Sequence, residues 1–398
     1  MSKVISVNSG SSSLKFQLFD MPSETVLTSG QAERIGQQLG TFTIKVNGEK
    51  KSKDLPIPDH KTAVKLLLDA LLENGIVASL EEIQGAGHRI VQGGAYYDQS
   101  VVADADVVNK VRELSELAPL HNPAHLVCYE AFCEALPHIG HVFVFDTAFH
   151  QTMEPDSYLF PVPYDWYTQY GIRRYGAHGT SHMYVNRRTA ELMGKDVSTL
   201  NMITCHLGNG ASITAIRNGK VVNTSMGLTP LGGIMMGTRC GDIDPTVVFY
   251  MMKKLDCTPD DMDTILNKRS GMLGVSGISS DARDIQAAVD KGNERAILTT
   301  DLYTNRVVNV VGGYYAQLGH VDAIAFTAGL GENDTNTRER ILKGVEEALG
   351  LSIDYDLNAT IHGKECLISK PDSKIAVYVV PTNEELVIAR DTCRLLGL

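Results

Sequence analysis

The stretch that decides the fold is VISVNSGSSSLKFQLF, residues 4–19, together with its echo MITCHLGNGASITAI, residues 202–216. Each reads as an apolar strand, a tight turn of small polar residues and a second apolar strand. Turns built from Gly, Ser and Asn let backbone N–H groups and small hydroxyls approach a charged ligand closely. Two such hairpins in one chain therefore predict two similar lobes that grip one polyphosphate from opposite sides.

Length and composition set the protein class. At 398 residues the chain exceeds one typical core, so we expect two domains. The net charge of −11 argues against a nucleic-acid partner, because no basic face is left to neutralise phosphates. No apolar run reaches about eighteen residues and no signal-peptide pattern precedes the first strand, so no membrane partner is expected. Seven cysteines without C-x-x-C spacing predict reduced thiols and a cytoplasmic protein.

Strands alternate with amphipathic helices along the chain, which predicts an α/β fold with helices covering mixed sheets. The expected helices begin after Asp59 or His60, after Asp104 and at an Asn122 N-cap followed by Pro123, and further helices cover about 244–255, 281–291, 294–318, 334–349 and 383–396. The expected strands include 83–91, 141–145, 323–327 and 375–380. We expect a turn at 328–333, a solvated basic loop at 50–53, and an irregular segment at 155–170 close to a domain boundary.

Three charged residues stand where ligands commonly bind. Asp146 follows an apolar strand, and open α/β sheets bind ligands at the carboxyl ends of strands. A bound cation would satisfy this carboxylate, and so would a strand-end cap or a salt bridge. Arg89 and Arg239 lie among glycines, a setting that suits bidentate recognition of carboxylate or phosphate. The alternative for each arginine is a structural Arg–Asp pair, with Asp242 or Asp244 as partner.

Histidines and glycines supply further candidates. His178 lies in GAHGTSH, where glycine neighbours give it little cover and favour a ligand-facing role, although a metal pair with His182 is an alternative. Histidines and cysteines also gather between 121 and 141, but none has the spacing of a zinc knuckle, and satisfied core or surface residues explain them better. Gly329-Leu330-Gly331 lies between a strand and a helix and could cradle a nucleotide. A P-loop is excluded, because the chain has no G-x-x-x-x-G-K-[ST].

Taken in order, these pieces resemble the acetokinase family over essentially the whole chain. The motifs that carry the resemblance are VNSGSSSLK (7–15), GHRIV (87–91), APLHNP (118–123), FDTAFHQT (145–152), YGAHGTSH (175–182), HLGNG (206–210), MGTRCG (236–241), FTAGLGEN (326–333) and PTNEE (381–385). Several are long and rarely found outside acetokinases, so the resemblance is specific.

The resemblance implies two ribonuclease-H-like lobes of the actin-like ATPase fold, with mixed sheets flanked by helices and a nucleotide cleft between the lobes. The first lobe would comprise residues 1–149 and about 386–398, and residues 150–385 would form the second lobe, with most nucleotide contacts. The resemblance also implies a homodimer.

Carried over residue by residue, the family pattern implies an active site. Asp146, His178 and Arg239 would be catalytic, and Arg89 would bind the substrate. Asn8 and Glu384 would hold Mg²⁺, or Mn²⁺ in its place. The ATP or ADP contacts would be Lys15, His206, Leu207, Gly208, Asn209, Gly210, Asp281, Ala282, Arg283, Gly329, Leu330, Gly331, Glu332 and Asn333, and the methyl pocket would be Val91, Leu120, Ala177 and Pro230.

The implied reaction is reversible transfer of the γ-phosphoryl group of ATP to acetate. A carboxylate is already ionised at neutral pH, so it needs no general base, and the obstacle is repulsion between two anions. We therefore hypothesise that Asp146 mainly positions Mg²⁺. Val91 shortens the methyl pocket and favours acetate, whereas Ala177 leaves room for propionate as a weaker substrate. The alternatives are a propionate or short-chain carboxylate kinase and a non-catalytic nucleotide-binding protein of the same fold.

Overall fold

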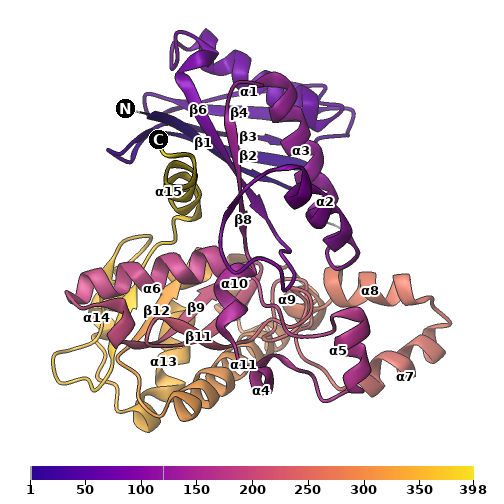
Figure 1. Cartoon of the computed structure of the whole chain (residues 1–398). Coiled ribbons are helices and arrows are strands. Elements are labelled where there is room, and N and C mark those ends of the chain that lie inside the picture. Colours follow the sequence, from indigo (N-terminus) through magenta and orange to yellow (C-terminus); the bar gives the residue numbers. More distant parts are fainter. Residues whose placement is uncertain (1, 120) are drawn as a thin grey trace. The chain divides into compact units, whose positions relative to one another are not determined.

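The computed structural model describes residues 2–119 and 121–398, and the chain forms two compact units (Figure 1). Unit 1 comprises Met1–Ala148 and Asn383–Leu398, and unit 2 comprises Phe149–Thr382. Leu120, which the sequence assigned to the methyl pocket, lies outside the described residues. Of the helices described, none combines the length and apolar character that crossing a bilayer requires.

Unit 1 is built on an eight-stranded mixed sheet with the order β5-β4-β3-β2-β1-β6-β8-β7. Its strands are β1 Ser2–Ser9, β2 Ser13–Met21, β3 Thr25–Glu33, β4 Gly40–Val46, β5 Glu49–Leu55, β6 Ile83–Ile90, β7 Val101–Val102 and β8 Gly140–Phe145. The predicted first hairpin is confirmed as the antiparallel pair β1–β2. The basic run at 50–53 was predicted to be a loop, and this prediction is wrong. These residues lie in the edge strand β5, where lysines discourage pairing with another chain.

Helices cover both faces of this sheet. They are α1 His60–Glu73, α2 Ala105–Glu113, α3 Asn122–Ala135 and α15 Glu384–Leu396, with short 3₁₀ turns at Leu80–Glu82 and Leu114–Glu116. Helices α1 and α3 pack on the apolar side chains of β1 and β2, while α15 lies against β1, β6 and β8. This close approach requires glycine at position 87, because a Cβ there would lie 2.3 Å from Oγ1 of Thr392.

Unit 2 repeats the plan of unit 1 with a six-stranded sheet of order β11-β10-β9-β12-β14-β13. The strands are β9 Asn201–Leu207, β10 Ala211–Arg217, β11 Lys220–Thr224, β12 Ala323–Thr327, β13 Cys366–Leu367 and β14 Ala376–Val379. The predicted second hairpin is confirmed as β9–β10. In both units an antiparallel meander is followed by two parallel strands, β6 and β8 in one and β12 and β14 in the other. The predicted fold class, α/β with two mixed sheets flanked by helices, is confirmed.

The helices of unit 2 contain most of the differences from prediction. They are α4 Pro155–Tyr158, α5 Tyr164–Tyr170, α6 Gly179–Met193, α7 Pro245–Leu255, α8 Pro259–Lys268, α9 Gly271–Ser276, α10 Ala282–Val289, α11 Glu294–Leu318, α12 Ala328–Asn333, α13 Thr335–Leu349 and α14 Tyr355–Asn358, with 3₁₀ turns at Ala148–Thr152 and Val197–Thr199. The segment 155–170, predicted to be irregular, therefore contains two short helices, and the predicted turn at 328–333 is helical.

In unit 1 the predicted helix cap at Asn122 is wrong. The N-cap of α3 is His121, and Asn122 lies inside the helix with its side chain bonded to the backbone N–H and C=O of Gln92. The asparagine thus joins α3 to the loop after β6.

Candidate active site

In unit 1, three polar residues meet at the carboxyl ends of parallel strands. Asn8 lies near the end of β1, Arg89 near the end of β6, and Asp146 directly after β8. Because side chains alternate across a strand, these residues share the sheet face with Gly87, the face against which α15 packs. The parallel register therefore brings together three of the residues predicted for the site.

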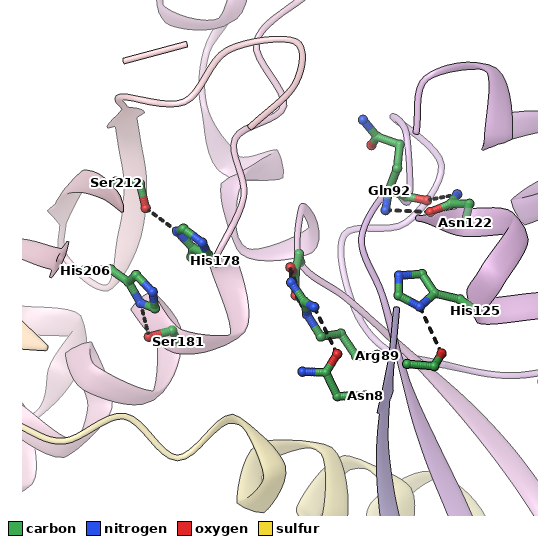
Figure 2. A network of polar contacts seen from close by, with 11 residues as sticks. Asn8, Arg89, Gln92, Asn122, His125, His178, Ser181, His206 and Ser212 are labelled. Carbon is green, nitrogen blue, oxygen red and sulfur yellow. Dashed lines mark hydrogen bonds and ion pairs between the residues drawn. The ribbon is translucent and has the colours of Figure 1, made fainter. Parts of the chain in front are cut away.

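Arg89 is the centre of this cluster. Its Nε donates to Oδ1 of Asp146 at 3.0 Å, its Nη2 to Oδ2 of Asp146 at 2.5 Å, and its Nη1 to Oδ1 of Asn8 at 3.0 Å (Figure 2). Asp146 is 1% exposed, so the ion pair satisfies a buried carboxylate. Burial alone would lower the pKa of Arg89, but the charge and hydrogen bonds of Asp146 outweigh burial and raise it. Arg89 is thus paired with Asp146, which was not among the partners considered from the sequence.

Glu384 begins α15 beside this pair. Its pKa is raised to about 7 by burial, to which the charges of Asp146 and Glu385 add, while Arg89 and Lys15 oppose the rise. A carboxylate in this setting is poorly compensated by the protein alone. Lys15, the predicted nucleotide contact in this unit, is exposed and lines a groove of about 440 Å³ with Glu385.

Two histidines hold the turn that follows Asn8. Nδ1 of His125 lies 3.2 Å from Oγ of Ser9, and Nε2 of His60 lies 2.7 Å from the carbonyl oxygen of Gly10. His125 belongs to the group between 121 and 141 that was weighed as a zinc site. Among the described residues, no group of three or more His, Cys, Asp or Glu side chains could hold a metal ion.

In unit 2, His178 caps α6 in a left-handed conformation, with φ of 59°, which is uncommon for a residue other than glycine. Its Nδ1 lies 2.9 Å from Oγ of Ser212, and its ring stacks on that of His206 with 4.0 Å between centroids. His206 is held in turn by Oγ of Ser181 at 2.8 Å from Nδ1 (Figure 2). These contacts fix the ring in one orientation.

Arg239 faces the same space as His178. A Cβ on Gly210 would lie 3.3 Å from Nη1 of Arg239 and 3.4 Å from Nε2 of His178, so glycine keeps this space open. Among the described residues, no carboxylate lies within ion-pair distance of Arg239, whose Nη1 donates to the carbonyl of Pro230 at 3.3 Å. Burial lowers the pKa of Arg239. The result is a half-buried cation that an anion would satisfy.

The two aspartates weighed as partners of Arg239 are used elsewhere. Oδ1 of Asp242 accepts from the N–H of Gly233 at 2.7 Å, and Oδ1 of Asp244 accepts from the N–H of Thr246 and caps α7. The structural alternative therefore fails for Arg239.

A cavity of about 930 Å³ in unit 2 collects half of the predicted nucleotide contacts. Those that line it are Asn209, Asp281, Ala282, Arg283, Gly329, Leu330 and Asn333. Sequence reasoning missed its other lining residues, Ser280, Gln286, Ala287, Asp290, Asp334, Thr335, Asn336 and His362. One usable signal was the i, i+4, i+8 spacing of Ala282, Gln286 and Asp290, which places the first two on one face of α10 and the third at its C-cap.

The other predicted nucleotide contacts of unit 2 do not line this cavity. They are His206, Leu207, Gly208, Gly210, Gly331 and Glu332. Leu207 is buried in the core on the opposite side of β9 from His206. Glu332 turns its carboxylate inward, where Oε1 accepts from the N–H groups of Ala328 at 2.8 Å and Thr382 at 3.1 Å. Glu332 thus connects the start of α12 to the backbone at Thr382.

The three described residues that were predicted to form the methyl pocket differ in exposure. Val91 and Ala177 are buried, at 5% and 3% exposed, and Pro230 is half-buried. Unit 1 offers a carboxylate-rich cluster around Arg89. Unit 2 offers Arg239, which has no acidic partner among the described residues, together with an oriented histidine and a large cavity.

Comparison with known proteins gives a consistent answer. The chain matches the acetokinase family over residues 3–390. It is 54% identical to the acetate kinase of Geobacillus kaustophilus over 100% of both chains, and 53% identical to that of Bacillus subtilis over 99% of this chain and 100% of the relative. Among solved structures, Porphyromonas gingivalis acetate kinase superimposes with a TM-score of 0.95 at 45% identity, covering 100% of both chains. A propionate kinase from Francisella tularensis superimposes with a TM-score of 0.94 at 39% identity, covering 99% of this chain and 100% of the other.

Proposed function

Since this chain belongs to the acetokinase family and transfers a phosphoryl group between ATP and acetate, we propose that Arg239 and His178 stabilise the group in transit. The observation that carries this proposal lies at Gly210, where Nη1 of Arg239 and Nε2 of the oriented His178 both approach the glycine and, among the described residues, the guanidinium has no acidic partner. Preorganised donors of this kind act on the equatorial oxygens of the transferring phosphoryl group.

The other charged residues act on the acid. Acetate is ionised when it binds, so no residue has to remove a proton, and Arg89 offsets its charge. Asp146 and Asn8 hold the guanidinium in one orientation through three of its nitrogens. Replacing Arg89 with alanine should therefore raise the KM for acetate strongly, and an unchanged KM would contradict this role.

Mg²⁺ fits the donor set at the start of α15. The ion is usually held by one or two carboxylates together with substrate phosphates and water. Glu384 supplies a carboxylate whose pKa is raised to about 7 by burial, and Asn8 supplies an amide oxygen. When bound, Mg²⁺, or Mn²⁺ in its place, would neutralise charge on the phosphates. Asp146 adds negative charge near the proposed Mg²⁺ site. The same carboxylate orients Arg89 through its hydrogen bonds.

The nucleotide belongs in the cavity of unit 2. Gly329, Leu330 and Asn333 line it on α12, and Asp281 and Arg283 line it at the start of α10. We propose that unit 1 is the lobe for the acid and the metal and unit 2 the lobe for the nucleotide.

Replacement of Arg239 tests the central proposal. We expect Arg239→Ala to lower kcat for acetyl phosphate formation by about 10²–10³-fold, the usual cost of losing a preorganised donor. Arg217→Ala is the matched control, because Arg217 ends β10 in the same unit and, among the described residues, its side chain donates to the carbonyl of Gln317 alone. A loss below about fivefold in Arg239→Ala would refute the assignment.

The size of the acid is set by Val91 and Ala177. The buried Val91 favours acetate, and the small Ala177 leaves room for a slower reaction with propionate. Trapping the acyl phosphate as its hydroxamate with acetate, propionate and butyrate tests this order. A faster reaction with butyrate than with acetate would contradict it, and no product with any acid would leave only nucleotide binding.

Exposed apolar side chains support a homodimer. Helix α7 buries none of its residues and exposes Phe249 and Tyr250, at 64% and 57%, and α5 exposes Trp166 and Tyr170, at 48% and 65%. Patches of this kind commonly mark protein interfaces. We expect light scattering to give twice the chain mass, and Phe249→Glu with Tyr250→Glu to give monomers. A monomeric wild type would exclude the dimer.

All seven cysteines are free thiols. This supports the proposal that the protein works in a reducing compartment such as the cytoplasm.

A further inference from the structure

A second layer of buried polar side chains lies behind His178, between α6 and the β9–β10 hairpin of unit 2. His182, one helical turn after His178, places Nδ1 2.7 Å from Oγ1 of Thr204 and Nε2 2.8 Å from Oγ of Ser212. The same Ser212 oxygen lies 2.9 Å from Nδ1 of His178 (Figure 2). Thr204, His182 and Ser212 are each 0% exposed. They form an unbroken hydrogen-bonded chain that ends at the histidine of the site.

The protons in this chain can be ordered in three ways. Each contact requires one proton, a neutral imidazole carries one N–H and one bare nitrogen, and a hydroxyl can donate one proton and accept two. In the forward order Thr204 donates to His182, His182 donates to Ser212, and Ser212 donates to His178. In the reversed order His178 donates to Ser212, Ser212 to His182, and His182 to Thr204. In the third order Thr204 donates to His182, while His182 and His178 both donate to Ser212.

The hydroxyls of Thr204 and Ser212 decide among the three orders. Among the described residues, the Thr204 hydroxyl has His182 as its one hydrogen-bond partner, and the Ser212 hydroxyl has His182 and His178. In the reversed order the hydroxyl proton of Thr204 would point at no acceptor, and in the third order the same holds for the proton of Ser212. Both places are fully buried, so an unbonded proton costs free energy. In the forward order both hydroxyl protons are bonded, and the forward order is therefore the stable one.

We propose that Thr204, His182 and Ser212 are positioning residues that hold His178 as the neutral tautomer with its proton on Nε2. This nitrogen faces the space at Gly210 beside Arg239. The proposal rests on the proposed role of His178, because a ring that stabilises a phosphoryl oxygen must present a hydrogen-bond donor to it. Because Ser212 donates its proton to Nδ1, the one proton of the neutral His178 ring lies on Nε2.

The surroundings oppose a second proton on His178. Protonation of Nδ1 would make Ser212 an acceptor from His178 and would leave the buried hydroxyl proton of Ser212 or of Thr204 unbonded. Burial lowers the pKa of His182 well below its usual value, with further lowering from the charges of His150 and His206, so His182 stays neutral. The ring of His206 stacks on that of His178, and the guanidinium of Arg239 faces the same glycine.

Nitrogen chemical shifts of the imidazole rings test the proposal directly. In the full-length protein labelled with ¹⁵N-histidine, two-bond ¹⁵N–¹H spectra distinguish the two tautomers and the imidazolium, and His178→Gln assigns the signals of His178. At pH 7.5 we expect His178 to carry its proton on Nε2. In Thr204→Val we expect a mixture of tautomers and an upward shift in the midpoint of the His178 titration.

A matched control separates this effect from loss of a buried hydroxyl. Thr189 lies on α6, is also 0% exposed, and donates to the carbonyl of Val185 outside the chain of bonds. Thr189→Val should therefore leave the His178 signals and their titration unchanged. Ser212→Ala, which removes the link to His178, should lower kcat by about tenfold with both KM values within about twofold.

The outcomes are distinct. A wild-type His178 with its proton on Nδ1, or an imidazolium at pH 7.5, would overturn the proposal, and so would a Thr204→Val spectrum identical to that of the wild type. If instead His178→Gln kept full kcat, the proposed role of His178 would fail, while the spectra would still decide the proton order.

Discussion

The ion pair between Arg89 and Asp146 should dominate the stability of the strand ends in unit 1. In Arg89→Gln the carboxylate of Asp146 stays in place, 1% exposed, without its cation. Removing one partner of a buried pair costs about 3–5 kcal/mol. We expect the lower end, because the side chain of Arg89 is itself 21% exposed and water reaches the pair. For a unit of this size about 3 kcal/mol corresponds to a fall in melting temperature of roughly 6–12 °C.

Calorimetry of the wild type and of Arg89→Gln at pH 8 measures this deficit.

The double variant Arg89→Gln with Asp146→Asn serves as the control, because it removes both charges and leaves no buried ion unpaired. It should lose less stability than Arg89→Gln alone. A deficit below about 1 kcal/mol in the single variant at pH 8, or an equal deficit in the double variant, would refute the reasoning.

Three further changes test other parts of the structure. Val91→Ala should raise the ratio of kcat/KM for propionate over acetate by about tenfold, since one methylene is worth about 1–3 kcal/mol; an unchanged ratio would remove Val91 from the pocket. Gly87→Ala should lower the melting temperature, because its Cβ would lie 2.3 Å from Thr392, whereas Gly312→Ala, with open space around it, should not. Glu384→Gln should stabilise the metal-free protein at pH 8 by about 1–3 kcal/mol. The Glu384 pKa of about 7 exceeds that of the unfolded chain, so urea titrations should show this gain vanishing as the pH falls toward 4, and a gain that grows on acidification would contradict it.

Local patterns predicted the elements of the fold well because each depends on residues close in sequence. The hairpins at 4–19 and 202–216 are specified by apolar runs and small turn residues, and Asp59 and Asp104 cap their helices as expected. Short helices such as α4 and α12 escaped prediction, because four to six residues give too little periodicity.

Side-chain partners were less predictable, since they are set by tertiary contacts. Arg89 and Asp146 were both singled out, but nothing in the sequence showed that two strands would join them into one pair. Glu332 lies within a nucleotide-binding motif, yet its carboxylate bonds to Ala328 and Thr382. A motif thus identified the correct segment without showing which of its side chains face the ligand.

The charges of the two units explain why neither site is complete without a ligand. Unit 1 places Asp146, Glu384 and Glu385 near Arg89 and Lys15, and burial raises the pKa of Glu384, so the ionised carboxylate is costly without a bound cation. Unit 2 leaves Arg239 without an acid among the described residues, and burial lowers its pKa, so a bound anion would favour its charged form. Mg²⁺ supplies the charge that suits the first cluster, and the phosphates of a nucleotide supply the charge that suits Arg239. Each ligand should therefore stabilise the protein. Thermal unfolding should shift to higher temperature in Mg²⁺ alone and in ADP alone, and the absence of a shift with either ligand would contradict this account.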